Sequence, residues 1–442
     1  MKEVAVSKKG IRWLYGELPD LVSRGLLTED AAQRLRDHYG NPEEERRLPI
    51  ALIVCSVLGA TLVALGIILM LAHNWEFMSR GVRTFVAFAP LLTGQALAAY
   101  AIARKSCSPV WAESTGAFLA LSIGACIALI GQTYQIPGDL GAFLLTWALL
   151  GLPLVYLLNA SVPAVLYMAG MTGWAIYRES TNDPSEWYWL LLLLVVPHIT
   201  IAYREDRFGL RSTWLTWAFC ATLCVATGFV LERSLPGLWI VVYSSLFTSI
   251  YLGGVVWAGP AKAFWRRPLR TIGGVGICVM ALLLSFEWPW HEVGWYHYHS
   301  GIESETLGLV HDLAVLALYT VVAVVLLVKV LGSANRLPAV LGVTPIVATL
   351  GYVMASAYEL ETPPMLLYNG YLLALGVGVT ALGLQLGRLG TLNAGLAIMA
   401  AWITARFFDS DMDFVTRGIV FILLGAGFLG ANLAMLRRRR TA

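Results

Sequence analysis

The sequence predicts an all-α polytopic membrane protein with about fourteen transmembrane helices. Of its 442 residues, 58% are hydrophobic and only 13% are charged, whereas about a quarter of the residues in a soluble domain are charged. Apolar runs recur from residue 50 almost to the last residue. Each is about 20 residues long, the length that crosses a hydrocarbon core roughly 30 Å thick.

Charged residues, prolines and glycines divide the apolar sequence into fourteen segments, and we expect each to form a helix. The first runs from Ile50 to Ala72 and contains no charged residue. The fourth and fifth are separated only by Asn159-Ala160, so they form either a tight hairpin or one broken element. The fourteen segments are 50–72, 82–103, 112–131, 140–158, 161–177, 187–203, 212–231, 236–257, 270–286, 312–331, 338–357, 365–386, 391–408 and 415–436.

A charged segment, residues 1–48, precedes the first apolar run. Its sequence WLYGELPDLVSRGLLTEDAAQRLRDHY predicts a helical hairpin of two short amphipathic helices that meet at Arg24-Gly25. Thr28 suits the cap of the second helix, with Glu29 and Asp30 in its first turn. Two such short helices cannot bury a core alone. We therefore expect this cytoplasmic head to pack on the membrane domain or a protein partner, or to lie on the membrane surface.

The basic residues predict that both termini face the cytoplasm. With fourteen crossings and the N-terminus inside, 25 of the 31 Lys and Arg residues fall in cytoplasmic segments, including the basic tail 437–442. This bias follows the positive-inside rule. Acidic residues lean the other way, with 16 of the 28 in outer segments. The six basic residues in outer segments are Arg80, Arg83, Arg178, Arg233, Arg406 and Arg417.

Similar motifs in the two halves of the chain predict an internal repeat. IGQTYQIPGDLGAFLLTWALLG resembles MASAYELETPPMLLYNGYLLALG, which pairs Tyr134 with Tyr358. These matches favour two parallel six-helix repeats, residues 50–203 and 270–436, with a two-helix linker at 204–269. The alternative is that the membrane interface selects aromatic and charged residues at every helix end.

Four stretches of the sequence resemble a known family. They are LVSRGLLTEDAAQRLRDHYG, LAHNWEFMSRGVR, GQTYQIPGD and the closing RFFDSDMDFVTRGIVFILLGAGFLGANLAMLRRRR. They resemble the bacterial membrane proteins grouped as domain of unknown function 2157, more specifically over about residues 11–140 than at the C-terminus. The resemblance implies a protein of the bacterial cytoplasmic (inner) membrane. It implies no reaction, substrate or cofactor.

Polar residues at the outer ends of the helices form the candidate substrate-binding site. Arg80, Arg83 and Arg417 lie where the positive-inside rule disfavours them, so each needs an acidic partner, a lipid phosphate or an anionic ligand. The alternative is a ring of ion pairs and interface anchors that binds nothing. The candidate residues are His73, Glu76, Arg80, Arg83, Gln132, Tyr134, Asp139, Glu359, Arg406, Asp409 and Arg417.

We predict no metal site, no cofactor and no catalytic residues. The loop 287–312 contains His297 and His299, and imidazoles with carboxylates suit zinc or copper. However, it lacks an HExxH spacing and thiols, and its tryptophans favour a loop that lies on lipid headgroups. No P-loop, dinucleotide fingerprint or nucleic-acid module is present. Gly383 and Gly387, four residues apart, predict close helix packing.

Two functions fit this sequence best. The first is a transporter or flippase-like carrier of an amphipathic or anionic envelope precursor, which would enter between the two halves. The second is a membrane scaffold that recruits a protein partner through residues 1–48. A membrane enzyme that uses the His-rich loop 287–312 is a third hypothesis. The lipid bilayer is a partner in all three.

Overall fold

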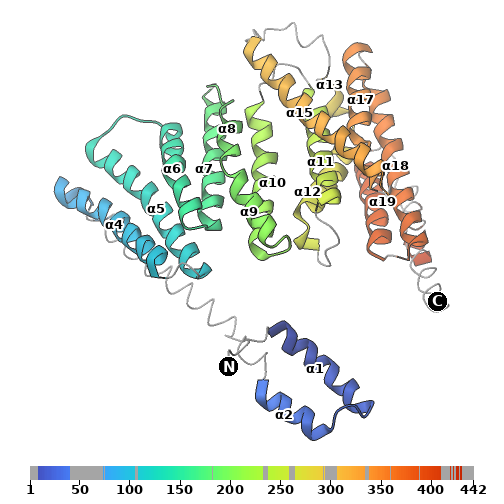
Figure 1. Ribbon diagram of the computed structural model, residues 1–442. Helices are drawn as coiled ribbons and strands as arrows, with labels where there is room; N and C mark the ends of the chain where they lie inside the picture. The colour runs from blue at the N-terminus through green and yellow to red at the C-terminus, as the bar shows by residue number, and fades with distance from the viewer. Residues whose placement is uncertain are drawn as a thin grey trace. The chain divides into compact units, whose positions relative to one another are not determined.

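The computed structural model describes most of the chain as helices (Figure 1). The described residues are 8–39, 73, 75–104, 108–181, 183–231, 237–257, 264–291, 293, 306–333, 338–358, 360–387, 389–409, 419, 422, 425–427 and 429–430. The chain divides into two compact units, Met1–Arg83 and Thr84–Ala442. Among the described residues every regular element is a helix.

The first unit contains the two short helices expected before the first apolar run. α1 (Lys8–Ser23) and α2 (Glu29–Tyr39) pack against each other through the buried side chains of Leu18 and Ala32. The turn between them includes Gly25, whose φ of +69° suits glycine. The Tyr15 hydroxyl donates to the Arg36 carbonyl at 3.2 Å. The unit continues through the 3-10 helix η2 (Trp75–Phe77) into the first residues of α4.

The second unit is a set of packed helices in which sequence neighbours are mostly adjacent (Figure 1). They are α4 (Arg80–Arg104), α5 (Pro109–Tyr134), α6 (Leu140–Leu157), α7 (Ser161–Ser180), α8 (Tyr188–Leu193), α9 (Val196–Glu205), α10 (Leu210–Val230), α11 (Leu238–Trp257), η3 (Phe264–Arg266), α12 (Pro268–Leu283), α13 (Trp288–His291), α15 (Thr306–Leu331), α16 (Ala339–Gly342), α17 (Thr344–Tyr358), α18 (Thr362–Gln385) and α19 (Leu389–Asp409).

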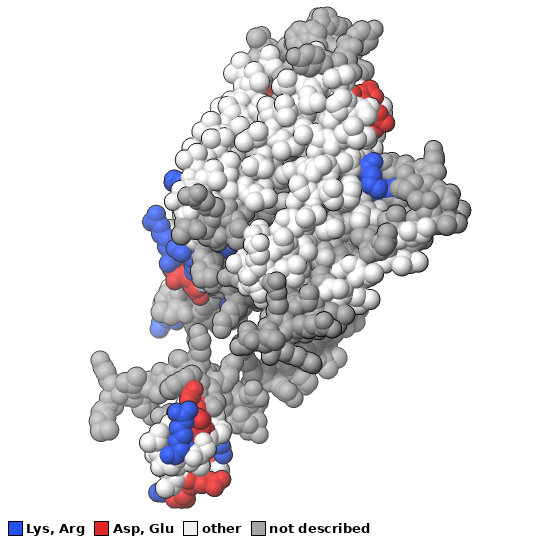
Figure 2. Space-filling view, turned by 90° about the vertical axis from the view of Figure 1, so that its right-hand side faces the viewer, with Lys and Arg blue, Asp and Glu red and all other residues white. Residues whose placement is uncertain are grey.

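Eight helices within the described residues are long and apolar enough to cross a membrane. They are α4, α5, α6, α10, α11, Gly308–Leu331 in α15, Ala339–Ala357 across α16 and α17, and α18. Large apolar side chains such as Phe85 and Leu190 are exposed on this unit. Figure 2 shows a broad uncharged area, with the charged residues toward its edges. Such a surface suits contact with lipid. The all-α membrane fold is therefore confirmed.

The number of crossings and the repeat remain predictions. The predicted helix 50–72 lies outside the described residues, as does most of 415–436. The other twelve predicted segments all coincide with helices. α11, which the sequence analysis assigned to the linker, packs against α10, α12, α15, α16 and α17. Of the eight candidates it is the most buried, with 61% of its apolar window inside the structure.

Two predicted helices are divided: 338–357 into α16 and α17, and 187–203 into α8 and α9. Residues 187–203 divide because Pro197 lacks the N–H that would continue the helical hydrogen bonds. Two tyrosines bond to carbonyls at this break: Tyr167 on α7 donates to the Leu191 carbonyl at 2.7 Å, and Tyr156 on α6 donates to the Leu194 carbonyl. Backbone polar groups in a membrane need such partners.

The two glycines expected to pack closely have different roles. A Cβ on Gly383 would clash with the backbone of Leu392, so α18 and α19 approach each other closely there. Gly387 has a φ of +63° and no atom near the position of its missing Cβ. It therefore ends α18 in the left-handed conformation and does not mediate helix packing.

Candidate functional site

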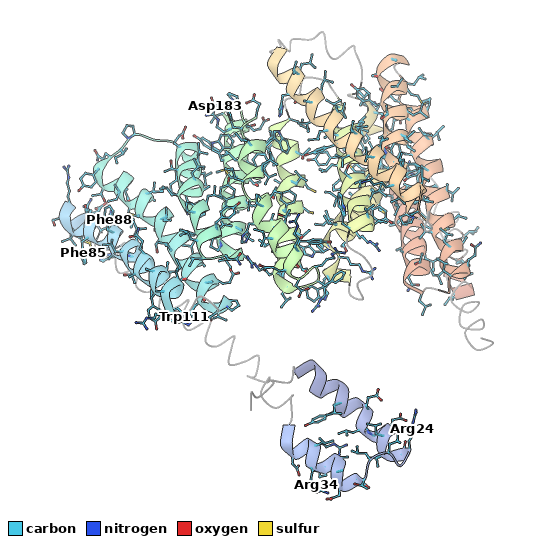
Figure 3. All side chains as sticks on the ribbon, in the orientation of Figure 1. Arg24, Arg34, Phe85, Phe88, Trp111 and Asp183 are labelled. Carbon is cyan, nitrogen blue, oxygen red and sulfur yellow. The ribbon has the colours of Figure 1, made fainter. Side chains whose placement is uncertain are left out.

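A groove of about 870 Å³ lies among α4, α5 and α6. Phe88, labelled on α4 in Figure 3, lines it together with Leu91. Further apolar side chains come from α5 and α6, including Ile123, Ile127 and Leu150. Its polar lining is limited to a few side chains: Gln95, Gln132, Asp139 and Thr146. The groove therefore combines a long apolar wall with a polar end at the α5–α6 turn.

The α5–α6 turn is shaped by specific backbone features. α5 ends at Gln135, which has a φ of 51° in the left-handed region. Asp139 then caps α6, because its side chain accepts the Ala142 N–H at 2.6 Å. Farther along the two helices, the indole of Trp147 on α6 donates to the carbonyl of Ala120 on α5 at 2.8 Å and connects them. The polar end of the groove is therefore held in a defined position.

Three of the predicted site residues lie together at this turn. Gln132 and Asp139 line the groove. Tyr134 is their neighbour, and its hydroxyl lies 3.0 Å from Thr84 Oγ1 on α4. The groove lies wholly within residues 88–154, inside the first predicted repeat. The sequence analysis expected substrate to enter between the two repeats.

The predicted site residues from His73 to Arg83 belong to the first unit. His73, Glu76 and Arg80 are exposed. Arg83, expected to need an acidic or anionic partner, contacts its own turn instead. Its Nε donates to the Met78 carbonyl at 3.1 Å and its Nη2 to the Glu76 carbonyl at 3.0 Å. The guanidinium also lies 5.8 Å from the centre of the Trp75 ring. Arg83 thus stabilises the turn from Trp75 to Met78.

Arg406 lies on α19, at the opposite end of the row of helices from α5 (Figure 1). It donates to the Ser285 carbonyl and hydroxyl, the latter at 3.3 Å, and lies 4.7 Å from the centre of the Phe286 ring. Arg406 therefore binds Ser285, which follows α12. Glu359, Arg417 and the side chain of Asp409 lie outside the described residues, so one common outer site remains a prediction.

Two polar contacts near Arg406 were not anticipated from the sequence. Asn369 on α18 donates to the Ser285 carbonyl at 2.9 Å and accepts the Trp402 indole N–H at 2.8 Å. His291 Nδ1 lies 2.7 Å from the Glu361 carboxylate. This hydrogen bond raises the pKa of His291 above its usual value. The pairs are far apart in sequence, so helical periodicity alone could not reveal them.

His311 and Asp312 differ from their expected setting. The sequence analysis placed His311 in the loop 287–312 and Asp312 at its boundary with the predicted helix 312–331, but α15 begins at Thr306 and includes both. Trp189 Nε1 donates to His311 Nε2 at 2.9 Å, so the imidazole proton belongs on Nδ1. His311 Nδ1 lies 3.3 Å from the carboxylate of Asp312, and Asp312 is fully buried. Buried ionisable residues in membrane helices often have functional roles.

A second polar network joins α5, α7, α9 and α10. The Glu113 carboxylate accepts the Ser161 N–H at 2.7 and 2.8 Å and the Val162 N–H at 2.8 Å, which places a negative charge at the start of α7. Ser161 also accepts a hydrogen bond from Arg211 at 3.2 Å.

Arg211 connects this network to α9. It donates to Asn159 at 2.6 Å and pairs with Glu205 at 3.4 Å. Its Nη2 lies 3.2 Å from Nε2 of buried His198. A guanidinium only donates hydrogen bonds, so His198 accepts with a neutral ring. Asn159, with a φ of 49°, forms the tight turn between α6 and α7, so the sequence alternative of a hairpin is the one observed.

Within the described residues, no three His, Cys, Asp or Glu side chains are grouped so as to hold a metal ion. His297 and His299 lie outside the described residues. The described cysteines, Cys126, Cys220, Cys224 and Cys278, carry no disulfide.

These observations define a helical membrane protein with several apolar helices and a largely apolar groove among α4, α5 and α6. Residues 19–164 match the family model described as "Predicted membrane protein (DUF2157)". The resemblance inferred from the sequence is therefore confirmed over residues 19–164, which include the later part of the N-terminal head, the turn before α4 and the helices of the groove. The matched residues do not include the C-terminal segment. No curated protein and no solved structure matches the chain.

Proposed function

We propose that this protein binds a lipid-like amphipathic molecule in the groove among α4, α5 and α6 and carries it across the bacterial inner membrane. The observation that carries this proposal is the groove itself, whose volume of about 870 Å³ and largely apolar lining suit hydrocarbon. Gln132 and Asp139 at its polar end would contact the polar part of the molecule. An amphipathic envelope precursor has this chemistry.

The direction of the groove supports a carrier. Its lining begins at Gln95 and Leu154 and ends at the α5–α6 turn, so it follows most of α6, the second half of α5 and the middle of α4. A molecule whose polar group moved along this wall would keep its hydrocarbon in contact with apolar side chains. The topology that goes with this proposal has fourteen crossings, both termini in the cytoplasm, a head at 1–48 and two repeats, 50–203 and 270–436, around a linker, 204–269.

The test is to fill the groove. Thr146→Trp places an indole in it, whereas Leu149→Trp adds the same group to an exposed position of α6 that does not line the groove. With a photoreactive fatty acid in vesicles, we expect labelled peptides from α4 to α6 in the wild type and in Leu149→Trp. Labelling and the flipping of a fluorescent phospholipid should both fall in Thr146→Trp. Equal labelling of the two variants would refute the proposal.

The second candidate is a scaffold that recruits a protein through the helical hairpin 1–48. The observation in its favour is that α1 and α2 form a compact pair whose outer surface is charged, with ion pairs Arg24–Asp20 at 2.9 Å and Arg34–Asp30 at 2.5 Å (Figure 3). Deletion of residues 1–45 discriminates between the two functions. Lost function with normal membrane insertion and normal labelling of the groove would favour the scaffold.

A further inference from the structure

A second, smaller pocket lies where α9 ends and α10 and α12 begin. It is lined by Tyr203, Arg207, Thr213, Arg266 and Arg267, among others, and we call these five residues the basic pocket. Three arginines line this small space, and none of its lining residues is acidic. Asp206, adjacent in sequence, accepts the Phe208 N–H at 3.1 Å. The pocket is therefore electropositive.

Three polar atoms of the basic pocket are buried and have no hydrogen-bond partner among the described residues: Tyr203 Oη, Thr213 Oγ1 and Arg267 Nε. Thr213 is only 2% exposed. A buried polar atom without a partner is costly, so three in one pocket require a partner that the described residues do not supply. Two hydroxyls and a guanidinium N–H can all donate, so the missing partner is an acceptor.

The backbone around the basic pocket also favours an anion. α10 begins at Leu210 and α12 at Pro268, so the N-terminal ends of two helices lie beside the pocket. Their free N–H groups and helix dipoles attract negative charge. Arginine forks match the oxygens of a phosphate group better than those of a halide.

The size of the pocket sets where such a group would lie. The enclosed space is about 10 Å³, which accommodates one water molecule or one oxygen atom. The phosphorus would therefore lie at the mouth, between Arg207 and Arg266, with one oxygen or a bridging water toward Thr213. Trp265 and Leu210 are exposed beside it. An indole and a leucine at a basic helix end suit the boundary between headgroups and acyl chains.

We propose that the basic pocket binds a phosphate group, as presented by an anionic phospholipid headgroup or by a soluble phosphate compound. This site is separate from the groove among α4, α5 and α6. It lies at the helix ends that the charge distribution assigns to the cytoplasmic side, where anionic lipids attract basic residues. Its ligand holds α9, α10 and α12 together at that end.

The experiment measures binding to the full-length protein in detergent. Native mass spectrometry counts retained phosphatidylglycerol, with phosphatidylcholine as the zwitterionic comparison, and thermal unfolding follows added inorganic phosphate. Arg207→Ala removes a pocket guanidinium, whereas Arg204→Ala removes the same charge from an exposed residue of α9 that does not line the pocket. Loss of one charge-assisted hydrogen bond should weaken binding about tenfold or more in Arg207→Ala. Arg204→Ala should bind like the wild type.

Thr213→Val separates binding from folding. Because the Thr213 hydroxyl has no partner in the described structure, its replacement by a methyl group should leave the lipid-free protein as stable as the wild type or more stable. The same change should weaken binding. Selective retention of phosphatidylglycerol identifies the lipid source, and protection by inorganic phosphate identifies the soluble source. No binding of either, or equal loss in Arg204→Ala and Arg207→Ala, overturns the proposal. Thr146→Trp in the groove should not change this binding.

Discussion

Replacement of Glu113 by alanine should loosen the start of α7. Glu113 projects from α5 and accepts the N–H groups of Ser161 and Val162 at 2.7–2.8 Å. These are the first two residues of α7, where N–H groups have no partner within the helix. Ala160, at the N-cap position, has no side-chain oxygen that could substitute. Only the Glu113 carboxylate accepts these two N–H groups among the described residues.

The magnitude follows from these two donors. A donor that loses its acceptor in a half-buried position costs about 1–3 kcal/mol, and loss of a negative charge at a helix start costs about 0.3–1 kcal/mol more. Because Glu113 is only half-buried and water reaches part of the turn, we take the lower part of each range. Glu113→Ala should then destabilise the protein by about 2–4 kcal/mol. Glu113→Gln keeps one oxygen acceptor and should lose about half as much.

The assay is reversible unfolding of the purified protein in mixed detergent and SDS micelles, with hydrogen exchange to locate the change. Ser114→Ala, at the exposed neighbouring position of α5, is the matched control and should unfold like the wild type. Faster exchange at Ser161 and Val162 is expected in Glu113→Ala alone. If Glu113→Ala and Ser114→Ala unfold at the same denaturant concentration, the capping argument is incorrect.

Three further predictions concern other contacts. Tyr167→Phe removes the hydroxyl that donates to the Leu191 carbonyl at 2.7 Å, so the free energy of unfolding should fall by about 1 kcal/mol. Hydrogen exchange around the α8–α9 break should become faster, and unchanged exchange there would contradict this prediction. Gly383→Ala adds a Cβ against the backbone of Leu392 and should lower the free energy of unfolding, measured by calorimetry, by about 1–3 kcal/mol. Gly390→Ala is the control and should have little effect, because no atom is near the position of its missing Cβ. Because Glu361 raises the pKa of His291 in the folded protein, the pair should stabilise the fold at pH values below the ordinary histidine pKa and lose this effect as pH rises through the raised value. An NMR titration of His291 should show the higher pKa in the wild type and not in Glu361→Gln; equal values would exclude the pair.

Long apolar stretches were the most dependable guide to the fold. Each of the twelve predicted segments that fall in described residues contains helix, because a chain in hydrocarbon must satisfy its backbone within the segment itself. Helix ends were less predictable. The sequence analysis predicted one helix over 187–203 and did not use Pro197 as a break. The contacts of Tyr156 and Tyr167 that stabilise the break come from α6 and α7 and have no local signature. The buried position of Asp312 and the contact of His311 with Trp189 depended on where α15 begins.

The candidate site shows the same division. Composition and periodicity alone determined that this chain is helical and lies in a membrane, since both depend on properties that each segment carries by itself. The sequence also drew attention to Gln132 and Asp139 at a turn. Only the tertiary structure decided that a groove lies beside them, that Arg83 and Arg406 bond to backbone carbonyls, and that Tyr203, Thr213 and Arg267 converge on one pocket. The physical reason is that hydrogen-bond partners and cavities depend on how separate helices pack, and residues on different helices carry no mark of their partners in the linear order of the chain.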